Sequence, residues 1–108
     1  MSWKVELFIN NREDRPVSDF FKLLDDSTLH KAMKVINLLG EYGPNITVPY
    51  SKRITRCISE LRTGGKNPIR ILYGRKKDMF ILLHAFKKKT NKLPVKELKL
   101  AESRFDSL

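Results

Sequence analysis

Apolar residues in the second half of the chain gather into runs that have the length of β-strands. Residues 69–73 (IRILY) and 79–86 (MFILLHAF) are two such runs, and each follows a sequence of turn-forming residues. A third, shorter run ends in ELR at residues 60–62. Short loops between neighbouring strands favour antiparallel hairpins. We therefore predict three consecutive antiparallel strands. Because residues 79–86 are apolar at almost every position, they should form a central strand that is covered on both faces.

The first half of the chain combines one alternating segment with two segments of helical periodicity. Residues 3–9 alternate between apolar and polar side chains, which is typical of a half-buried strand. Pro16 suits the first turn of a helix, and residues 26–28 (DST) can end that helix and cap a second one. The second helix should stop near residues 40–43, because Gly40, Gly43 and Pro44 do not favour its continuation. Two helices joined by so short a break should form a hairpin that packs on the sheet.

The remaining segments complete the predicted order. Residues 45–51 are interpreted as a connector, because Pro49 argues against a central strand. Pro94 should lie in the first turn of a last helix whose inner face includes Leu98 and Phe105. The order β-α-α-β-β-β-α predicts a single α+β domain over residues 1–108. It should have an antiparallel-rich sheet, an N-terminal helical hairpin and a C-terminal helix.

Positive charge is concentrated in the segment that carries the predicted strands. The chain has a net charge of +10, and residues 51–100 hold 15 Lys or Arg against 3 Asp or Glu. This imbalance predicts a polyanion or an acidic protein as partner. The single cysteine excludes an internal disulfide and fits a reducing cytosol. No apolar run is long enough to span a bilayer, so we expect no membrane association.

The strand pattern also predicts which side chains share a face. Glu60 and Arg62 lie on one face of their strand, because side chains alternate. If Arg62 pairs opposite Arg70, both arginines lie on that face. If Arg70 in turn lies near Leu82, then His84 joins them. A slip of one residue would reverse this arrangement, so the convergence depends on the register.

Standard catalytic motifs are absent from the sequence. There is no Gly-rich phosphate loop, no cluster of metal ligands, and no pair of carboxylates in the basic half. The remaining feature is a concentration of Arg and Lys on a rigid sheet, which suits phosphate binding. Two alternatives stay open: Arg70 is either an anion-binding residue or the structural partner of Glu60, and residues 87–89 (KKK) are either functional or a solvated strand end.

Three stretches resemble the HigB-like toxins of bacterial type II toxin–antitoxin systems. They are ELR at 60–62, IRILY at 69–73 and ILLHAFKKKTNKLPVKELKLA at 81–101. These toxins belong to the RelE/ParE superfamily, which includes a branch of phage-derived proteins, and the similarity covers about residues 52–105. The chain departs from the family pattern where Ile69, Ala85 and Leu93 stand at positions at which Tyr, Gly and Thr are common.

The resemblance implies a RelE-like fold and a cytoplasmic, metal-independent endoribonuclease without a cofactor. Such an enzyme cuts mRNA, often on the ribosome, by attack of the ribose 2′-hydroxyl on the adjacent phosphorus. It also implies a HigA-like helix-turn-helix antitoxin that forms a hetero-oligomer with the toxin. By matched position, Arg70 should bind the scissile phosphate and Arg62 an adjoining one. The predicted catalytic residues are Arg62, Arg70, His84, Lys87, Lys88 and Lys89, and the predicted RNA contacts are Lys52, Arg56 and Lys92.

Two other functions fit the same sequence. A ParE-like toxin would inhibit DNA gyrase by binding it, and the shared fold cannot distinguish the two classes. A noncatalytic basic module would bind RNA or the ribosome without cleaving. Dependence of RNA cleavage on single Arg or Lys residues would distinguish the nuclease from both, and cleavage that persists in a chelator would support the absence of a metal.

Overall fold

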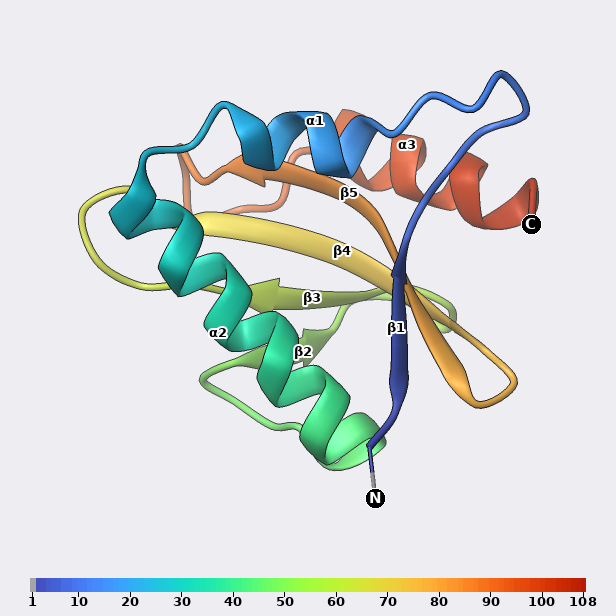
Figure 1. The fold of residues 1–108 in the computed structure, drawn as a ribbon, viewed down its shortest axis with the longest axis horizontal. Coiled ribbons are helices and arrows are strands. Elements are labelled where there is room, and N and C mark those ends of the chain that lie inside the picture. Colours follow the sequence, from blue (N-terminus) through green and yellow to red (C-terminus); the bar gives the residue numbers. More distant parts are fainter. Residues whose placement is uncertain (1) are drawn as a thin grey trace.

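A single mixed sheet organises the chain. The computed structural model describes residues 2–108, and its five strands lie in the order β1-β5-β4-β3-β2 (Figure 1). Only β1 and β5 run parallel, and every other neighbouring pair is antiparallel. The predicted α+β class with an antiparallel-rich sheet is therefore confirmed, and the arrangement is consistent with a RelE-like fold. The strands are β1 (Lys4–Leu7), β2 (Ser51–Arg53), β3 (Ser59–Arg62), β4 (Ile69–Lys76) and β5 (Met79–Lys87).

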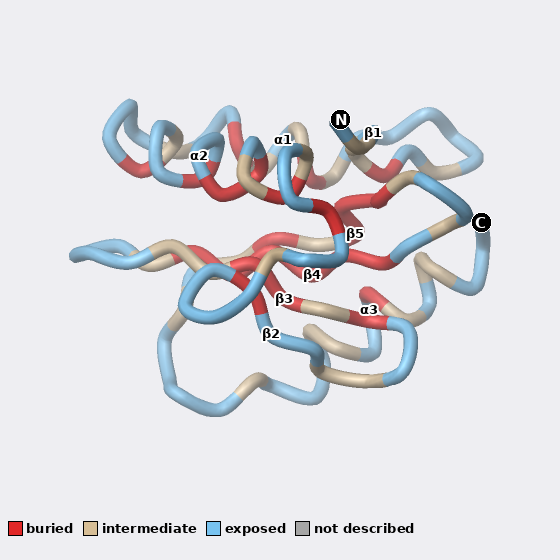
Figure 2. The backbone as a smooth tube through the Cα atoms, turned by 90° about the horizontal axis from the view of Figure 1, so that it is seen from below, coloured by how far each residue is buried: buried red, intermediate tan, exposed pale blue. Residues whose placement is uncertain are grey.

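Helices cover both faces of this sheet and make a three-layer molecule. Helices α1 (Pro16–Lys22) and α2 (Asp26–Tyr42) form the predicted hairpin on one face, and α3 (Val95–Asp106) lies on the other (Figure 2). A single 3₁₀ turn, η1 (Gly43–Asn45), follows α2. Among residues 2–108, no helix combines the length and the apolar character that crossing a bilayer requires.

The ends of α2 follow from local chemistry. The Asp25 carboxylate accepts a hydrogen bond of 2.7 Å from the Thr28 backbone N–H and caps the helix. The cap therefore lies one residue before the predicted segment 26–28, which instead forms the first helical turn. At the other end Gly43 has a φ of 55°, and a Cβ there would collide with the indole of Trp3. Gly43 thus ends α2 as predicted and lets the N-terminal segment pack closely against it.

Strand β5 is the central strand that its apolar sequence predicts. It lies between β1 and β4 and contributes to two apolar cores. Phe80, Leu82 and Ala85 face the core under the α1–α2 hairpin. Ile81 and Leu83 face the smaller core under α3. Both faces of β5 are covered, so its near-continuous apolar run has a simple physical cause.

The structure differs from the sequence prediction at the sheet edge. The segment interpreted as a connector ends in the short strand β2, which pairs with β3 from Ser51 opposite Leu61 to Arg53 opposite Ser59. A 2.7 Å hydrogen bond between Ser51 Oγ and Tyr73 Oη ties this edge strand to the sheet. Pro49 lies before the strand, so it removes no hydrogen bond from the ladder.

The register between the strands is confirmed in part. Arg62 lies opposite Arg70 as predicted. Arg70 lies opposite Phe86 and not near Leu82, because β4 and β5 extend to a two-residue turn and pair Lys76 with Met79. An irregularity after Leu72 then shifts the register by one residue. His84 lies opposite Leu72 and still shares the face of Arg70, as the prediction required.

Candidate functional site: a cationic cleft on the sheet

A cleft of about 570 Å³ opens on the face of the sheet that carries α3. Its floor comes from β2, β3, β4 and the end of β5, and one wall is formed by the loop 88–94 and the start of α3. We call it the cationic cleft. It is lined by Phe20, Lys52, Ile54, Glu60, Arg62, Arg70, Phe86, Lys87, Lys88, Lys89, Thr90, Asn91, Lys92, Leu93, Pro94, Lys96 and Glu97.

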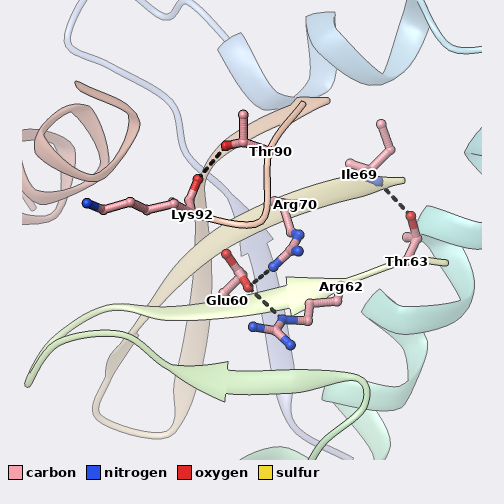
Figure 3. Close-up of polar contacts among 7 residues, drawn as sticks. All are labelled: Glu60, Arg62, Thr63, Ile69, Arg70, Thr90 and Lys92. Carbon is pink, nitrogen blue, oxygen red and sulfur yellow. Dashed lines mark hydrogen bonds and ion pairs between the residues drawn. The ribbon is translucent and has the colours of Figure 1, made fainter. Parts of the chain in front are cut away.

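Backbone pairing brings the two predicted arginines together. Arg62 ends β3 and Arg70 begins β4, and they are direct partners in the antiparallel ladder. The loop between them is closed by Thr63, whose hydroxyl accepts a 2.7 Å hydrogen bond from the Ile69 N–H (Figure 3). Because the loop is fixed on both sides, the guanidinium groups emerge from neighbouring strands at one place.

One buried carboxylate lies between these arginines. Glu60 Oε1 accepts from Arg62 Nε at 2.7 Å and from Arg70 Nη1 (Figure 3). The Glu60 side chain is 2% exposed, Arg70 is 11% exposed and Arg62 is 31% exposed. A charge that is taken out of water needs such a partner, so the triad is a satisfied structural unit. It also holds two cations against one anion, and Arg62 is the member that reaches furthest into solvent.

The lysines after β5 form the rim of the cationic cleft. Lys87 ends the strand, and the Lys88 backbone N–H donates to Pro68 O at 2.9 Å, which ties the loop to the segment before β4. Thr90 Oγ1 donates to Lys92 O at 2.8 Å and folds the loop back (Figure 3). Lys88 is half-buried, while Lys87 and Lys89 are exposed. The predicted catalytic lysines and Lys92 therefore line the same cleft as the arginine pair.

His84 lies on the same face of the sheet but does not line the cationic cleft. It stacks on Phe86 with ring centroids 5.5 Å apart, and its Nε2 lies 3.3 Å from Glu97 Oε1. Arg104 donates to Leu83 O at 2.8 Å and lies 3.4 Å from His84 Nδ1. Burial lowers the pKa of His84 below its usual 6.5, although the hydrogen bond that it donates to Glu97 acts in the opposite direction. His84 is therefore half-buried, both of its ring nitrogens have polar neighbours, and its ring stacks on Phe86, which lines the cleft.

The predicted site residues divide into those the cationic cleft gathers and those it does not. Arg56 lies outside it, in a second cleft beyond β2 that also contains Lys52. His84 is likewise outside. The predicted residues that line the cationic cleft are Lys52, Arg62, Arg70, Lys87, Lys88, Lys89 and Lys92.

Sequence reasoning did not assign two features of the cleft. Glu60 was considered only as a structural partner of Arg70, although the alternation of ELR already places it beside Arg62 on one face. The apolar wall was not anticipated, because its residues come from four separate segments. That wall consists of Phe20, Ile54, Phe86, Leu93 and Pro94. Among the residues that the structure describes, no three His, Cys, Asp or Glu side chains are arranged to hold a metal ion.

Comparison with known protein families identifies the family to which the chain belongs. A family model described as Phage derived protein Gp49-like (DUF891) matches residues 19–106, which include the C-terminal part of α1, all of α2, β2–β5 and all of α3. No curated protein matches the chain. The family match spans most of the sequence and all the residues that line the cationic cleft. The chain therefore belongs to the Gp49-like family of phage-derived proteins, a family of toxin–antitoxin toxins related to RelE and ParE.

Proposed function

We propose that this toxin is a HigB-like, metal-independent endoribonuclease that cleaves mRNA on the ribosome and so arrests translation and growth. The observation that carries this proposal is the cationic cleft, which gathers two fixed arginines and a lysine rim beside an apolar wall. Guanidinium groups bind phosphate oxygens strongly, and an apolar wall beside them gives a ribose or base a surface to rest on.

The proposed reaction uses the RNA's own nucleophile. The 2′-oxygen attacks the adjacent phosphorus, its proton passes to a lysine amine that acts as the general base, and a 2′,3′-cyclic phosphate forms. The bond from phosphorus to the 5′-oxygen breaks, and a protonated side chain gives that oxygen a proton. Arg62 and Arg70 stabilise the extra negative charge on the phosphate oxygens in the transition state. The base and the acid come from Lys87, Lys88 and Lys89, and Lys88 is the most firmly held because it is half-buried.

The remaining predicted residues have supporting roles in this proposal. Lys52 and Lys92 contact RNA phosphates at the rim of the cationic cleft. His84 acts as a positioning residue, because it stacks on Phe86, and Phe86 lines the cleft. A side chain in that place affects how the apolar wall is presented and does not itself reach the phosphate.

Membership of this toxin family implies an antitoxin partner. We propose a HigA-like helix-turn-helix protein with an acidic or apolar segment that covers the cationic cleft. Such a segment would match the excess of Lys and Arg and the apolar wall of the cleft.

A translation reaction programmed with one defined message tests the nuclease proposal. Wild-type protein should produce new RNA ends, mapped by primer extension, and Arg70→Ala should reduce their rate of appearance by about 10²–10³-fold, which is typical of losing a transition-state donor. The same message without ribosomes then reports whether cleavage depends on the ribosome.

Two further variants keep this test interpretable. Because Arg70 is buried with Glu60, the more exposed Arg62→Gln should also reduce cleavage while keeping the fold, which circular dichroism checks. Lys99→Gln removes one charge from an exposed position of α3 outside the cleft and should cleave like wild type. Intact RNA in every reaction, together with growth arrest in cells, would refute the nuclease and favour a gyrase-inhibiting toxin.

A further inference from the structure

A second basic cleft lies at the free edge of the sheet, next to the proposed catalytic site. It has a volume of about 450 Å³ and is bordered by β2, the turn that follows it and the outer ends of β4 and β5. We call it the edge cleft. Its cations are Lys52, Arg53, Arg56 and Arg75, and no carboxylate is among its lining residues.

The cations of the edge cleft are held without neutralising partners. Arg53 donates to Arg56 O at 3.4 Å, so these two residues are linked through the backbone of the turn. Arg75 lies 4.9 Å from the centre of the Trp3 ring and donates to Lys77 O at 2.9 Å. Within residues 2–108, none of the four forms an ion pair. Their charge is therefore available to an anion from outside the molecule.

Lys52 connects the two clefts. It lines both of them and is paired with Glu60 across β2 and β3. Arg53 follows on the same strand, so its side chain leaves the opposite face of the sheet edge. An extended chain that leaves the cationic cleft over Lys52 would therefore cross the outer edge of β2 and reach Arg53 and Arg56.

We infer that the edge cleft binds the phosphates of single-stranded RNA that flanks the cleaved bond, and this inference rests on the proposed nuclease function. Two clefts that share Lys52, a cation without an ion-pair partner in the described part of the chain, fit a polyphosphate chain. The hydroxyls of Tyr73 and Ser51, which both line the edge cleft, are already hydrogen-bonded to each other. The edge cleft therefore recognises charge and not base identity, and it adds affinity that depends on salt.

The chain contains its own probe for this inference. Cys57 is the single cysteine, it is exposed, and it lines the edge cleft. The experiment measures the rate at which iodoacetamide alkylates Cys57 in the wild-type protein. It compares a 2′-O-methyl octanucleotide, which cannot be cleaved, with a 2′-O-methyl trinucleotide. At saturation the octanucleotide should slow alkylation at least tenfold, and the trinucleotide should protect far less.

A charge-matched pair of variants gives a second readout. Arg53→Gln/Arg56→Gln should weaken binding of the octanucleotide more than that of the trinucleotide. It should also lower the slope of log Kd against log salt by about 1.4, at about 0.7 for each lost phosphate contact. Lys34→Gln/Lys99→Gln removes two charges from exposed helix positions outside both clefts and should bind like wild type.

The outcomes separate this inference from the proposed function. One outcome is that the octanucleotide binds in a way that depends on Arg62, while Cys57 is alkylated as fast as in the absence of RNA. The inference about the edge cleft is then overturned, and the nuclease proposal stands. If neither oligonucleotide binds, the inference about the edge cleft is overturned, and the translation reaction decides the nuclease proposal separately. If the antitoxin protects Cys57 and RNA does not, the edge cleft is a protein interface and the inference is wrong.

Discussion

The buried Glu60 carboxylate fixes the positions of the Arg62 and Arg70 guanidinium groups. Its burial predicts a measurable effect on stability. Arg70→Met should lower the free energy of unfolding by about 2–3 kcal/mol, because it leaves a buried carboxylate with one partner in place of two. Glu60→Gln/Arg70→Met should cost less than the sum of the two single changes. Urea denaturation of the four proteins measures this coupling.

The exposed pair of Lys4 and Glu6 provides the matched comparison for this cycle. Their charged atoms are 3.0 Å apart, but the side chains are 69% and 46% exposed. The corresponding cycle with Lys4→Met and Glu6→Gln should show a coupling of no more than about 0.5 kcal/mol. Equal coupling energies in the two cycles would refute the structural role assigned to the burial of Glu60.

His84 predicts a specific dependence of stability on pH. Burial lowers its pKa in the folded protein below the unfolded value of 6.5, so the unfolded chain binds the proton first on acidification. Stability should be insensitive to this group above pH 7. It should then fall as the pH drops below 6.5, by at most about 1.4 kcal/mol per unit until the folded histidine is protonated. The groups that face it are Glu97 and Arg104.

Urea denaturation between pH 5 and 7.5 tests this dependence. His84→Gln should remove this part of the fall, because glutamine does not titrate. His30→Gln changes the other histidine, which is exposed on α2, and should keep the wild-type profile. A wild-type profile in His84→Gln would mean that other groups cause the acid sensitivity.

At the scale of elements, the contact between β4 and α3 depends on a missing side chain. A Cβ at Gly74 would lie 2.5 Å from Phe105 Cδ1 and 3.3 Å from Cys57 O. Gly74→Ala should therefore push α3 away and reduce stability by about 1–3 kcal/mol. In a Phe105→Ala background the same change should cost clearly less, since alanine lacks the side-chain atoms that obstruct a Cβ at Gly74.

Denaturant unfolding of the four proteins of this cycle provides the measurement. Gly64→Ala is the matched control, because a Cβ at Gly64 meets no atom within 4 Å and the change should be nearly neutral. If Gly74→Ala costs the same in both backgrounds, contact with Phe105 does not explain the glycine.

The elements also show what the sequence could and could not predict. Hydrophobic periodicity was sufficient for the helical hairpin, the central strand and the last helix, because each buries a face whose pattern is local. Strand β2 could not be found in this way. It has three residues, two of them exposed lysine and arginine, and it exists because β3 offers it a free edge.

The candidate site was predicted as far as it depends on local pairing. The pairing of Arg62 with Arg70 follows from a short loop between strands, so it could be anticipated. The position of His84 depends on a one-residue irregularity in the ladder between β4 and β5, which hydrophobic alternation does not reveal. The apolar wall of the cationic cleft depends on tertiary contacts between distant segments and was beyond such reasoning.

At the scale of the whole molecule, the larger apolar core and the cationic cleft lie on opposite faces of the sheet. The α1–α2 hairpin buries the larger core on one face of the sheet, while the cationic cleft opens on the face that α3 covers only in part (Figure 2). More than half of the Lys and Arg side chains of residues 51–100 therefore line a cleft on the face that has no second hairpin. This arrangement lets a strongly basic surface exist without charges inside the main core.

The carboxylate between the two arginines affects when the cationic cleft is assembled. Because Glu60 satisfies both guanidinium groups within the chain, the protein does not depend on RNA or on a partner to assemble its anion-binding groups. In the proposed nuclease, the two guanidinium groups are therefore in place as soon as the chain has folded, without a separate activation step. The proposed antitoxin would then have to be made no later than the toxin.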